Sequence, residues 1–443
     1  MLEALPAPPR AELERHVRLA LKRYWAADER SLARLPRFER PFPLQFGVLR
    51  LVPVGMPAWA QGCAVEGHLL VPLEACDDAQ APTWDRVDWW LAAFLLLEGW
   101  HERAWELGHG AIHSYSLRLR GFDKRAWGRA WVNRIGLFLR AWAAHDSVDS
   151  EDTLCGPLPP PEIVLTHDVD AVAKTVSIRF KQAAFLAFNA VRQGPRAPRV
   201  AAARLWQALR FLLRGDDWWM FDVLLQLEHG AGVHSRFHFY ADDRPKTPAR
   251  WLYDPGYDVT QPRIVELLEQ LARSGHTIGL HQSHDAWRVP ARMRSQREHL
   301  QARVSARVTS CRQHWLRFSW SETWVAQEAA GFTQDSTLMF NDRAGLRTGA
   351  ALSWSPWNPR AGRPHTLHAL PTMLMDSHLY DYQMLAADDR RATMRAWLDE
   401  VVAVAGQAAV LWHPHTLSDD YGWREGFEEL LAAIQARTPC TAS

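Results

Sequence analysis

The spacing of hydrophobic residues divides the chain into two parts. In the first part, two stretches repeat hydrophobic positions every three or four residues, which predicts helices over 87–105 and 124–142. The second stretch carries one broad apolar stripe, for which core packing is the ordinary explanation: Trp127, Trp131, Ile135, Phe138 and Trp142. We therefore expect residues 1–150 to form a mostly helical domain with a few strands.

The pattern changes after residues 151–161, a polar and then proline-rich segment (EDTLCGPLPPP) that predicts a linker. Over 162–443, short β-branched or aromatic runs alternate with helical stretches, which is typical of repeated β–α units. Seven runs are candidate strands: Ile163–Thr166, Ser235–Tyr240, Thr277–Leu280, Val308–Cys311, Thr333–Met339, Thr372–Met375 and Ala408–Trp412.

Chemically active side chains follow almost every one of these runs. They are Asp168 and Asp170, His281 and His284, Arg312 and His314, Asp376, and His413 and His415. In a (β/α) barrel the active site lies at the C-terminal ends of the strands. The placement therefore favours a barrel enzyme.

Residues 171–215 interrupt the β–α repeat with nine basic residues and no acidic residue, interleaved with aromatic residues and leucines. A basic amphipathic helical pair can lie on an anionic membrane surface or grip an anionic polymer. The alternative, slightly favoured by the sequence, is an excursion that packs its apolar face on the barrel and leaves its charges in solvent.

Composition and length limit the class of protein. A chain of 443 residues with 47% hydrophobic and 23% charged residues is typical of a globular protein of two or three domains. The net charge of +1 argues against a nucleic-acid-binding protein. Five scattered Cys without a CxxC spacing argue against a disulfide framework or a zinc finger.

The sequence contains no pattern typical of export or of a membrane span. Its start lacks the apolar core of a signal peptide, and the longest apolar run, Trp89 to Leu97, is too short to cross a bilayer. We expect a cytoplasmic protein, peripheral to the inner membrane if residues 171–215 bind lipid.

Two carboxylates end the first predicted strand, in PEIVLTHDVD. Asp168 and Asp170 are two residues apart, so in an extended backbone both side chains point into the barrel mouth. One carboxylate can then bind a cation while the other acts as a general base. Acidic turns after strands are common, so the pair alone is a weak signal.

Histidines at two other strand ends strengthen the metal hypothesis. His281 and His284, with Asp285 next to them, can ligate zinc or a similar divalent ion. Arg312, if it lies beside the carboxylates, would hold the pKa of the base down, although a surface ion pair is the ordinary alternative. His413 follows the last strand, which can neighbour the first strand in a closed barrel, and there it can serve as a general acid.

In this order the motifs resemble those of the NodB-type polysaccharide deacetylases, carbohydrate esterase family 4. The resemblance covers about residues 160–420 and includes LTHDVD, GHTIGLH, RQHWLR and DSTLMFNDRAGLRTG. Residues 1–150, with FLLLEGWHE and SYSLRLRGF, resemble the N-terminal helical domain of one bacterial branch. The resemblance implies a distorted (β/α)7 barrel enzyme that removes acetyl groups from sugars. It also implies a bound divalent metal, for which we favour zinc.

The resemblance also implies roles for single residues. Asp168 matches the catalytic base, Arg312 the residue that orients this base, and His413 the catalytic acid. Asp170 and His281 match metal ligands.

Two departures from the family pattern affect the rest of the site. The second His of the family's metal motif falls at Asp285, so His284, which we favour, or Asp285 or His314 completes the ligand set. The family's Arg-Pro-Pro-Tyr motif is replaced by Arg-Gln-His-Trp, residues 312–315. We expect His314, Trp315 and Trp412 to contact substrate, since Trp can stack on sugar faces, although Trp412 suits a core equally well.

The sequence thus predicts a metal-dependent hydrolase that removes acetyl groups from a sugar of a surface polysaccharide or of its lipid-linked precursor. The partner is then a carbohydrate or glycolipid and not a nucleic acid. Two alternatives stay open: a pseudo-deacetylase that binds glycan or a partner, and a hydrolase of another C–N bond in a small metabolite. The oligomeric state stays open too.

Overall fold

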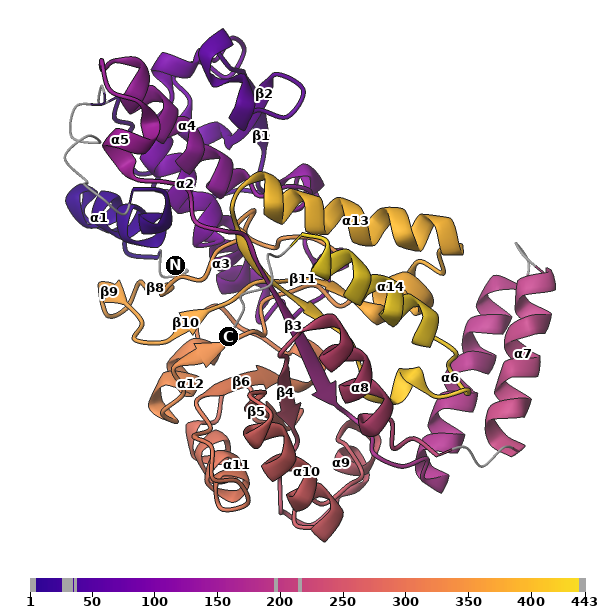
Figure 1. The fold of residues 1–443 in the computed structure, drawn as a ribbon. Helices are drawn as coiled ribbons and strands as arrows, with labels where there is room; N and C mark the ends of the chain where they lie inside the picture. The colour runs from indigo at the N-terminus through magenta and orange to yellow at the C-terminus, as the bar shows by residue number, and fades with distance from the viewer. Residues whose placement is uncertain (1–4, 26–34, 36–37, 195–197, 214–216, 438–443) are drawn as a thin grey trace.

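A sheet of eight parallel strands forms the centre of the computed structural model, which describes residues 5–25, 35, 38–194, 198–213 and 217–437 (Figure 1). The strand order is β10-β7-β6-β5-β4-β3-β12-β11. The strands are β3 (Glu162–Val169), β4 (Arg236–Phe239), β5 (Thr277–Gln282), β6 (Ser310–Gln313), β7 (Gln334–Asp335), β10 (His368–Ala369), β11 (Thr372–Met375) and β12 (Gln407–Leu411).

One continuous stretch of chain closes this sheet. β10 and β11 stand at opposite edges, yet only Leu370 and Pro371 separate them. The Leu370 N–H donates to the carbonyl of Asp335 in β7 (2.8 Å), and the Ala409 N–H of β12 donates to the carbonyl of Pro371 (2.8 Å). Counted as one strand, β10 and β11 give a barrel of seven strands. The predicted (β/α) barrel is therefore confirmed, and each of the seven predicted runs contributes to it.

Helices cover the barrel, and most of them bury hydrophobic residues against it. They are α8 (Phe221–Ala231), α9 (Pro248–Tyr253), α10 (Pro262–Arg273), α11 (Pro290–Gln301), α12 (Thr323–Ala329), α13 (Ala387–Ala403) and α14 (Arg424–Gln435). In α10, proline occupies the first turn, where its missing N–H costs nothing, and the buried leucines and Ile264 recur at steps of three and four.

The N-terminal part is mostly helical, as expected. It contains α1 (Arg10–Ala20), α2 (Trp89–Leu97), α3 (Trp100–His109), α4 (Trp131–His145), α5 (Glu151–Cys155) and an antiparallel pair, β1 (Leu51–Gly55) and β2 (His68–Pro72). The helix predicted over 87–105 is broken into α2 and α3 at Gly99, which has a φ of +53°. A Cβ there would lie 2.5 Å from the Trp320 ring, so glycine permits both the turn and this close packing.

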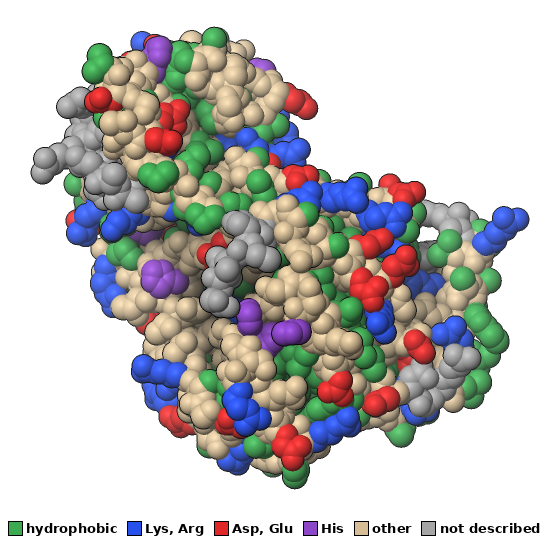
Figure 2. All heavy atoms as spheres, in the orientation of Figure 1, with side chains coloured by type: hydrophobic (Ala, Val, Ile, Leu, Met, Phe, Trp, Pro, Cys, Tyr) green, Lys and Arg blue, Asp and Glu red, His purple; other side chains and the backbone are tan. Residues whose placement is uncertain are grey.

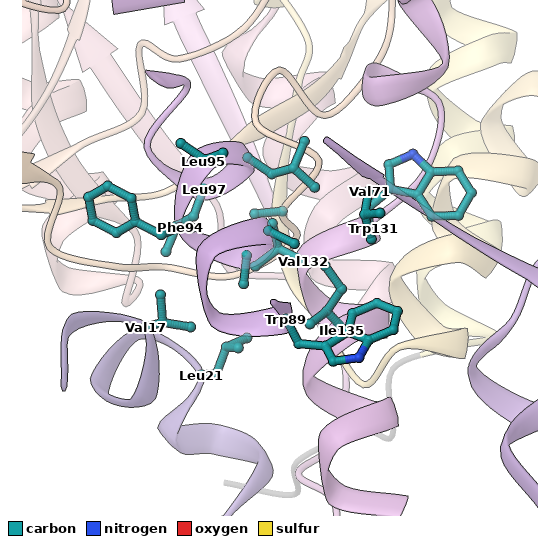
Figure 3. Packing of buried hydrophobic residues seen from close by; sticks show 14 of the residues in the cluster. Val17, Leu21, Val71, Trp89, Phe94, Leu95, Leu97, Trp131, Val132 and Ile135 are labelled. Carbon is teal, nitrogen blue, oxygen red and sulfur yellow. The ribbon is translucent and has the colours of Figure 1, made fainter. Parts of the chain in front are cut away.

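The hydrophobic core of the N-terminal part extends into the barrel loops. Figure 3 shows its centre, where side chains of α1, α2 and α4 interlock. The same cluster includes Phe318, Trp320, Trp354 and Leu367 from the loops that follow β6 and β7. The expected linker also packs here: residues 151–155 form α5, whose Glu151 and Asp152 pair with the buried Arg140.

Glu98, at the end of α2, is a buried polar link between the two parts. It is fully buried and accepts hydrogen bonds from Arg103 (2.8 Å) and from the Trp354 indole (3.1 Å) and the Trp357 N–H (2.9 Å) of the barrel loops. His16 lies 2.7 Å away. The carboxylate thus satisfies donors from both parts of the chain.

Replacing Glu98 by Ala should destabilise the fold by about 3–5 kcal/mol, because the buried Arg103 guanidinium would lose its partner. The free energy of unfolding in urea measures this loss. The control is Glu12→Ala, which removes an exposed ion pair with Arg15 and should cost about 0–1 kcal/mol. Equal stability of the two variants would contradict the prediction.

Two helices of the segment 171–215, α6 (Val176–Gln193) and α7 (Pro198–Leu213), pack together as a hairpin beside the barrel (Figure 1). Its inner side packs a small cluster: Ala171, Ala183, Leu186, Ala208, Phe211 and Trp218. Its outer side exposes large hydrophobic side chains, visible along the right-hand edge in Figure 2. The expected packing on the barrel thus covers only part of its apolar surface. No helix in the described ranges is long and apolar enough to cross a membrane.

Candidate active site and metal centre

The register of the sheet brings the predicted site residues to one end of the barrel. Asp168 of β3 lies opposite His238 of β4, and His281 of β5 lies opposite Arg312 of β6. Gly279 makes room between these strands, because a Cβ there would meet the His238 ring at 2.7 Å. Asp168 Oδ1 is consequently 3.1 Å from Arg312 Nη1 and 3.3 Å from His238 Nδ1.

Asp168 is a buried carboxylate that stays ionised. Burial alone would raise its pKa, but the Arg312 guanidinium, together with His281 and His238, lowers the pKa well below its usual range. Arg312 is itself buried and fixed in place by hydrogen bonds that it donates to Thr166 Oγ1 (2.9 Å), Thr372 Oγ1 (3.1 Å) and the Ser336 carbonyl (3.0 Å). Arg312 therefore fixes the ionised Asp168 carboxylate at a defined point in the barrel mouth.

Asp170, His281 and His314 bring three potential ligand atoms together. Asp170 Oδ1 lies 3.2 Å from His281 Nε2 and 3.4 Å from His314 Nδ1, and the two nitrogens are 2.7 Å apart. Ligand atoms around a tetrahedral zinc ion, with bonds of about 2.0–2.1 Å, are about 3.3 Å apart. These three residues are the candidate metal-binding group within the described residues.

The hydrogen bonds around the two histidines leave one ring nitrogen of each free to bind a cation. His281 Nδ1 donates to the Arg312 carbonyl (3.1 Å), and His314 Nε2 donates to the Tyr253 carbonyl (2.7 Å). In the neutral rings, His281 Nε2 and His314 Nδ1 then both carry lone pairs, and these nitrogens face each other at 2.7 Å. Two lone pairs repel unless a proton or a metal ion lies between them. Asp170 Oδ1, which is buried without a hydrogen-bond donor, faces the same point. The donor set therefore fits a divalent metal.

His284 and Asp285 lie outside this group. The His284 ring stacks on Tyr253 (centroids 4.5 Å apart) and its Nδ1 accepts a hydrogen bond from Arg317 (3.2 Å). Burial and Arg317 lower the pKa of His284 to about 4. Asp285 pairs with Arg244 (2.7 Å) and Arg292 (2.6 Å). The structure thus places His314, from the neighbouring strand, where we expected His284.

His413, two residues after the end of β12, faces the candidate metal-binding group. Its Nδ1 donates to Asp376 Oδ1 (2.8 Å), and its Nε2 lies 3.6 Å from Asp170 Oδ2. Burial would lower the pKa of His413, but Asp376, with Asp170 and Asp168, raises this pKa to about 10. The imidazole is therefore protonated at neutral pH and can donate a proton.

The residues expected to contact substrate have different surroundings. Trp315 is 45% exposed beside the metal group, and its indole donates to the Tyr253 carbonyl (3.0 Å). His314 is buried and is itself one of the three residues of the candidate metal-binding group. Trp412 is fully buried and packs against Tyr380 and Phe427, so it is a core residue and cannot stack on a sugar.

Two residues of the site, Asp376 and His238, have roles that the sequence alone does not predict. Asp376 follows a predicted strand, but its pairing with His413 depends on the neighbouring positions of β11 and β12. His238 sits inside the run Ser235–Tyr240, where it looks like an ordinary strand residue, and no spacing in the sequence links it to Asp168. For Asp376 a signal was present in its position at a strand end.

Replacing Asp376 by Asn should lower the pKa of His413. The carboxylate stabilises the protonated imidazole, so without it His413 loses its proton at a lower pH. An NMR titration of the His413 ring in metal-free protein measures the shift. The control is Asp388→Asn, an exposed carboxylate on α13, which should leave the titration unchanged. The same pair should stabilise the wild-type fold fully below about pH 6.5, with that contribution lost as pH rises towards 10.

Fold and site together define the class of this protein: a seven-stranded (β/α) barrel with a carboxylate–histidine centre at the C-terminal ends of its strands. No protein-family model matches the chain, and no curated protein matches it by sequence.

Solved structures that match include polysaccharide deacetylases, the family that the motifs resemble. A protein described as a polysaccharide deacetylase from Mycobacterium smegmatis is 16% identical, with a TM-score of 0.37 over 63% of this chain and 88% of that one. The chitin deacetylase of Colletotrichum lindemuthianum is 12% identical, with a TM-score of 0.32 over 63% and 84%. A CE4 family pseudoenzyme from Bacillus anthracis is 9% identical, with a TM-score of 0.29 over 62% and 61%. Similarity this low leaves the reaction to be argued from the site.

Proposed function

We propose that the protein is a metal-dependent hydrolase that removes acetyl groups from a carbohydrate. The observation that carries this proposal is the meeting of His281 Nε2, His314 Nδ1 and Asp170 Oδ1 beside a second, ionised carboxylate, Asp168. One carboxylate faces the histidines while the other stays bound to Arg312. This division suits a hydrolase that activates water.

Each residue of the site has a separate task in this reaction. A divalent ion held by Asp170, His281 and His314 would polarise the acetyl carbonyl and lower the pKa of a water molecule. Asp168 takes the proton from the attacking water, and Arg312 keeps Asp168 ionised and oriented. His413, held by Asp376, donates a proton to the departing amine or alcohol. Two imidazoles and one carboxylate favour zinc as the ion.

We propose a sugar of a surface polysaccharide, or its lipid-linked precursor, as the substrate. The exposed ring of Trp315 at the rim of the site supports a carbohydrate, because an indole can cover the apolar face of a sugar. The bond broken is then the amide or ester that joins the acetyl group to the sugar, with acetate as the product.

An acetate-release assay on purified protein tests this function. The substrates are N-acetylglucosamine oligomers, an O-acetylated xylan and a panel of small N-acetylated metabolites. We expect acetate from the sugars, loss of release after chelator treatment, and recovery with added zinc. Metal binding and glycan binding without any release would indicate a pseudo-deacetylase instead. Release from the small metabolites alone would indicate a hydrolase of another C–N bond.

A further inference from the structure

The outer face of the α6–α7 hairpin concentrates exposed hydrophobic surface. Ten of the 23 large hydrophobic side chains that are exposed among the described residues lie on these two helices. They are Val176, Phe180, Phe185, Phe188, Val191, Val200, Leu205, Trp206, Leu209 and Leu213. A monomeric soluble protein normally scatters such residues, whereas a contiguous group marks an interaction site.

The helical period places most of these side chains on one side of each helix. On α6, Val176, Phe180 and Val191 fall within about a sixth of a turn of one another at 3.6 residues per turn. On α7, Leu205, Leu209 and Leu213 recur at steps of four. The buried residues of the hairpin, such as Leu186 and Phe211, lie at other angles around the two helices. Most of the exposed hydrophobic side chains of each helix therefore lie together on one side of it.

This face continues towards the candidate active site through α9. Lys181 of α6 donates to the Trp251 carbonyl and lies over the Trp251 ring (4.9 Å to the centroid). Trp251 is half exposed, and two residues further on the Tyr253 carbonyl accepts the hydrogen bond of His314. The hairpin is therefore connected to the rim of the candidate site through α9.

The charged residues of the hairpin segment itself are all basic. Residues 171–215 contain no acidic residue, and the barrel neutralises two of their cations: Lys174 pairs with Asp420 (2.6 Å) and Arg204 approaches Asp381 (3.9 Å). Arg192 and Arg199, near the turn of the hairpin, are exposed and have no carboxylate partner among the described residues. An anionic surface would complement them.

We propose that the hairpin and Trp251 dock on an anionic lipid bilayer. The large apolar side chains would enter the boundary between headgroups and acyl chains, while arginines at their edges bind phosphate headgroups. A second copy of the chain suits the face less well, because it would bring two uncompensated sets of positive charge together. A nucleic acid or other polyanion would engage the arginines but leave ten hydrophobic side chains in water.

This docking goes beyond the proposed function and does not depend on it. If the proposed deacetylase function also holds, the docked hairpin would bring the rim at Tyr253 and Trp315 close to the headgroups. The site could then reach a sugar that is anchored to lipid.

Vesicle flotation of the full chain tests the proposal without metal or acetylated sugar. We expect binding to phosphatidylcholine vesicles that contain 30% phosphatidylglycerol, a fraction we choose to give a strong negative surface, and weak binding to pure phosphatidylcholine. The triple variant Phe180→Ser, Phe188→Ser and Trp206→Ser should lower the partition coefficient at least about tenfold. The matched control is Leu44→Ser, Leu117→Ser and Val148→Ser, three exposed hydrophobic residues elsewhere, which should bind like wild type.

A variant with fewer positive charges tests the proposed lipid binding independently. Arg192→Gln with Arg199→Gln keeps the apolar face and should weaken binding to the anionic vesicles about tenfold, with a smaller dependence on salt. Circular dichroism checks that each variant is folded. Equal vesicle binding by wild type and the triple variant would overturn the proposal. So would a dimer, seen by sedimentation, that only the triple variant disrupts, or binding to heparin without binding to vesicles.

Discussion

Replacing Asp168 by Asn should lower the rate of acetate release about 10³-fold at saturating substrate. Asn has the same shape and still accepts a hydrogen bond from Arg312, but its amide cannot take the proton from water. The geometry around Arg312, Thr166 and Thr372 should therefore persist while the base is lost. Turnover of the zinc-loaded variant, with its metal content measured in the same sample, checks this result.

Asp285→Asn is the matched control for this substitution. Asp285 is also an ionised carboxylate near the barrel mouth, but Arg244 and Arg292 hold it away from the metal group. We expect its turnover to stay within about threefold of wild type, since surface substitutions away from the chemistry have small effects. Full activity of the Asp168 variant would remove it from the role of base.

Replacing His314 by Ala should weaken zinc binding by more than about 100-fold. Loss of a residue that only supports a ligand typically costs 10–100-fold in metal affinity, and loss of a ligand costs more. Zinc retained after dialysis against a chelator of known affinity measures the effect. The same substitution should abolish acetate release, because in the proposed reaction the bound ion would polarise the acetyl carbonyl.

The variant His284→Ala distinguishes the ligand set assigned from the structure, which contains His314, from the set predicted from the motif, which contains His284. His284 stacks on Tyr253 and accepts from Arg317, so its removal should leave zinc affinity nearly unchanged. If His284→Ala loses zinc and His314→Ala keeps it, the ligand set that we assign from the structure is wrong and the set predicted from the motif is right.

The barrel was largely predictable because most of its strands lie within or beside short apolar runs that are buried in the sheet. The segment that closes the barrel was not predictable. β10 has only two residues, and nothing local shows that residues 368–375 leave one edge of the sheet and join the other. The break at Gly99 was equally hidden, because it depends on the Trp320 ring, which is distant in sequence.

The site residues were likewise predictable where the signal is local in the sequence, and not where it depends on the fold. Strand ends marked Asp168, Asp170, His281, Arg312 and His413, and the barrel brings these residues together. The spacing left the third candidate metal ligand open. β6 lies beside β5 in space, and His314, which directly follows β6, comes within 2.7 Å of His281. The loop after β5 instead turns His284 towards Tyr253. The cytoplasmic location and the boundary near residue 150 stay predictions.

The shared core of the N-terminal part has a consequence for synthesis on the ribosome. The cluster around α2 and α4 is complete only with residues such as Trp354 and Leu367, more than 200 residues later in the chain. At about 5–20 residues per second, the apolar helix α2 would wait roughly 10–50 s for these partners. Protease digestion of stalled nascent chains would reveal an N-terminal part that stays sensitive until residue 367 has emerged. The helices made first are then among the last to be protected, which gives chaperones a long interval in which to bind them.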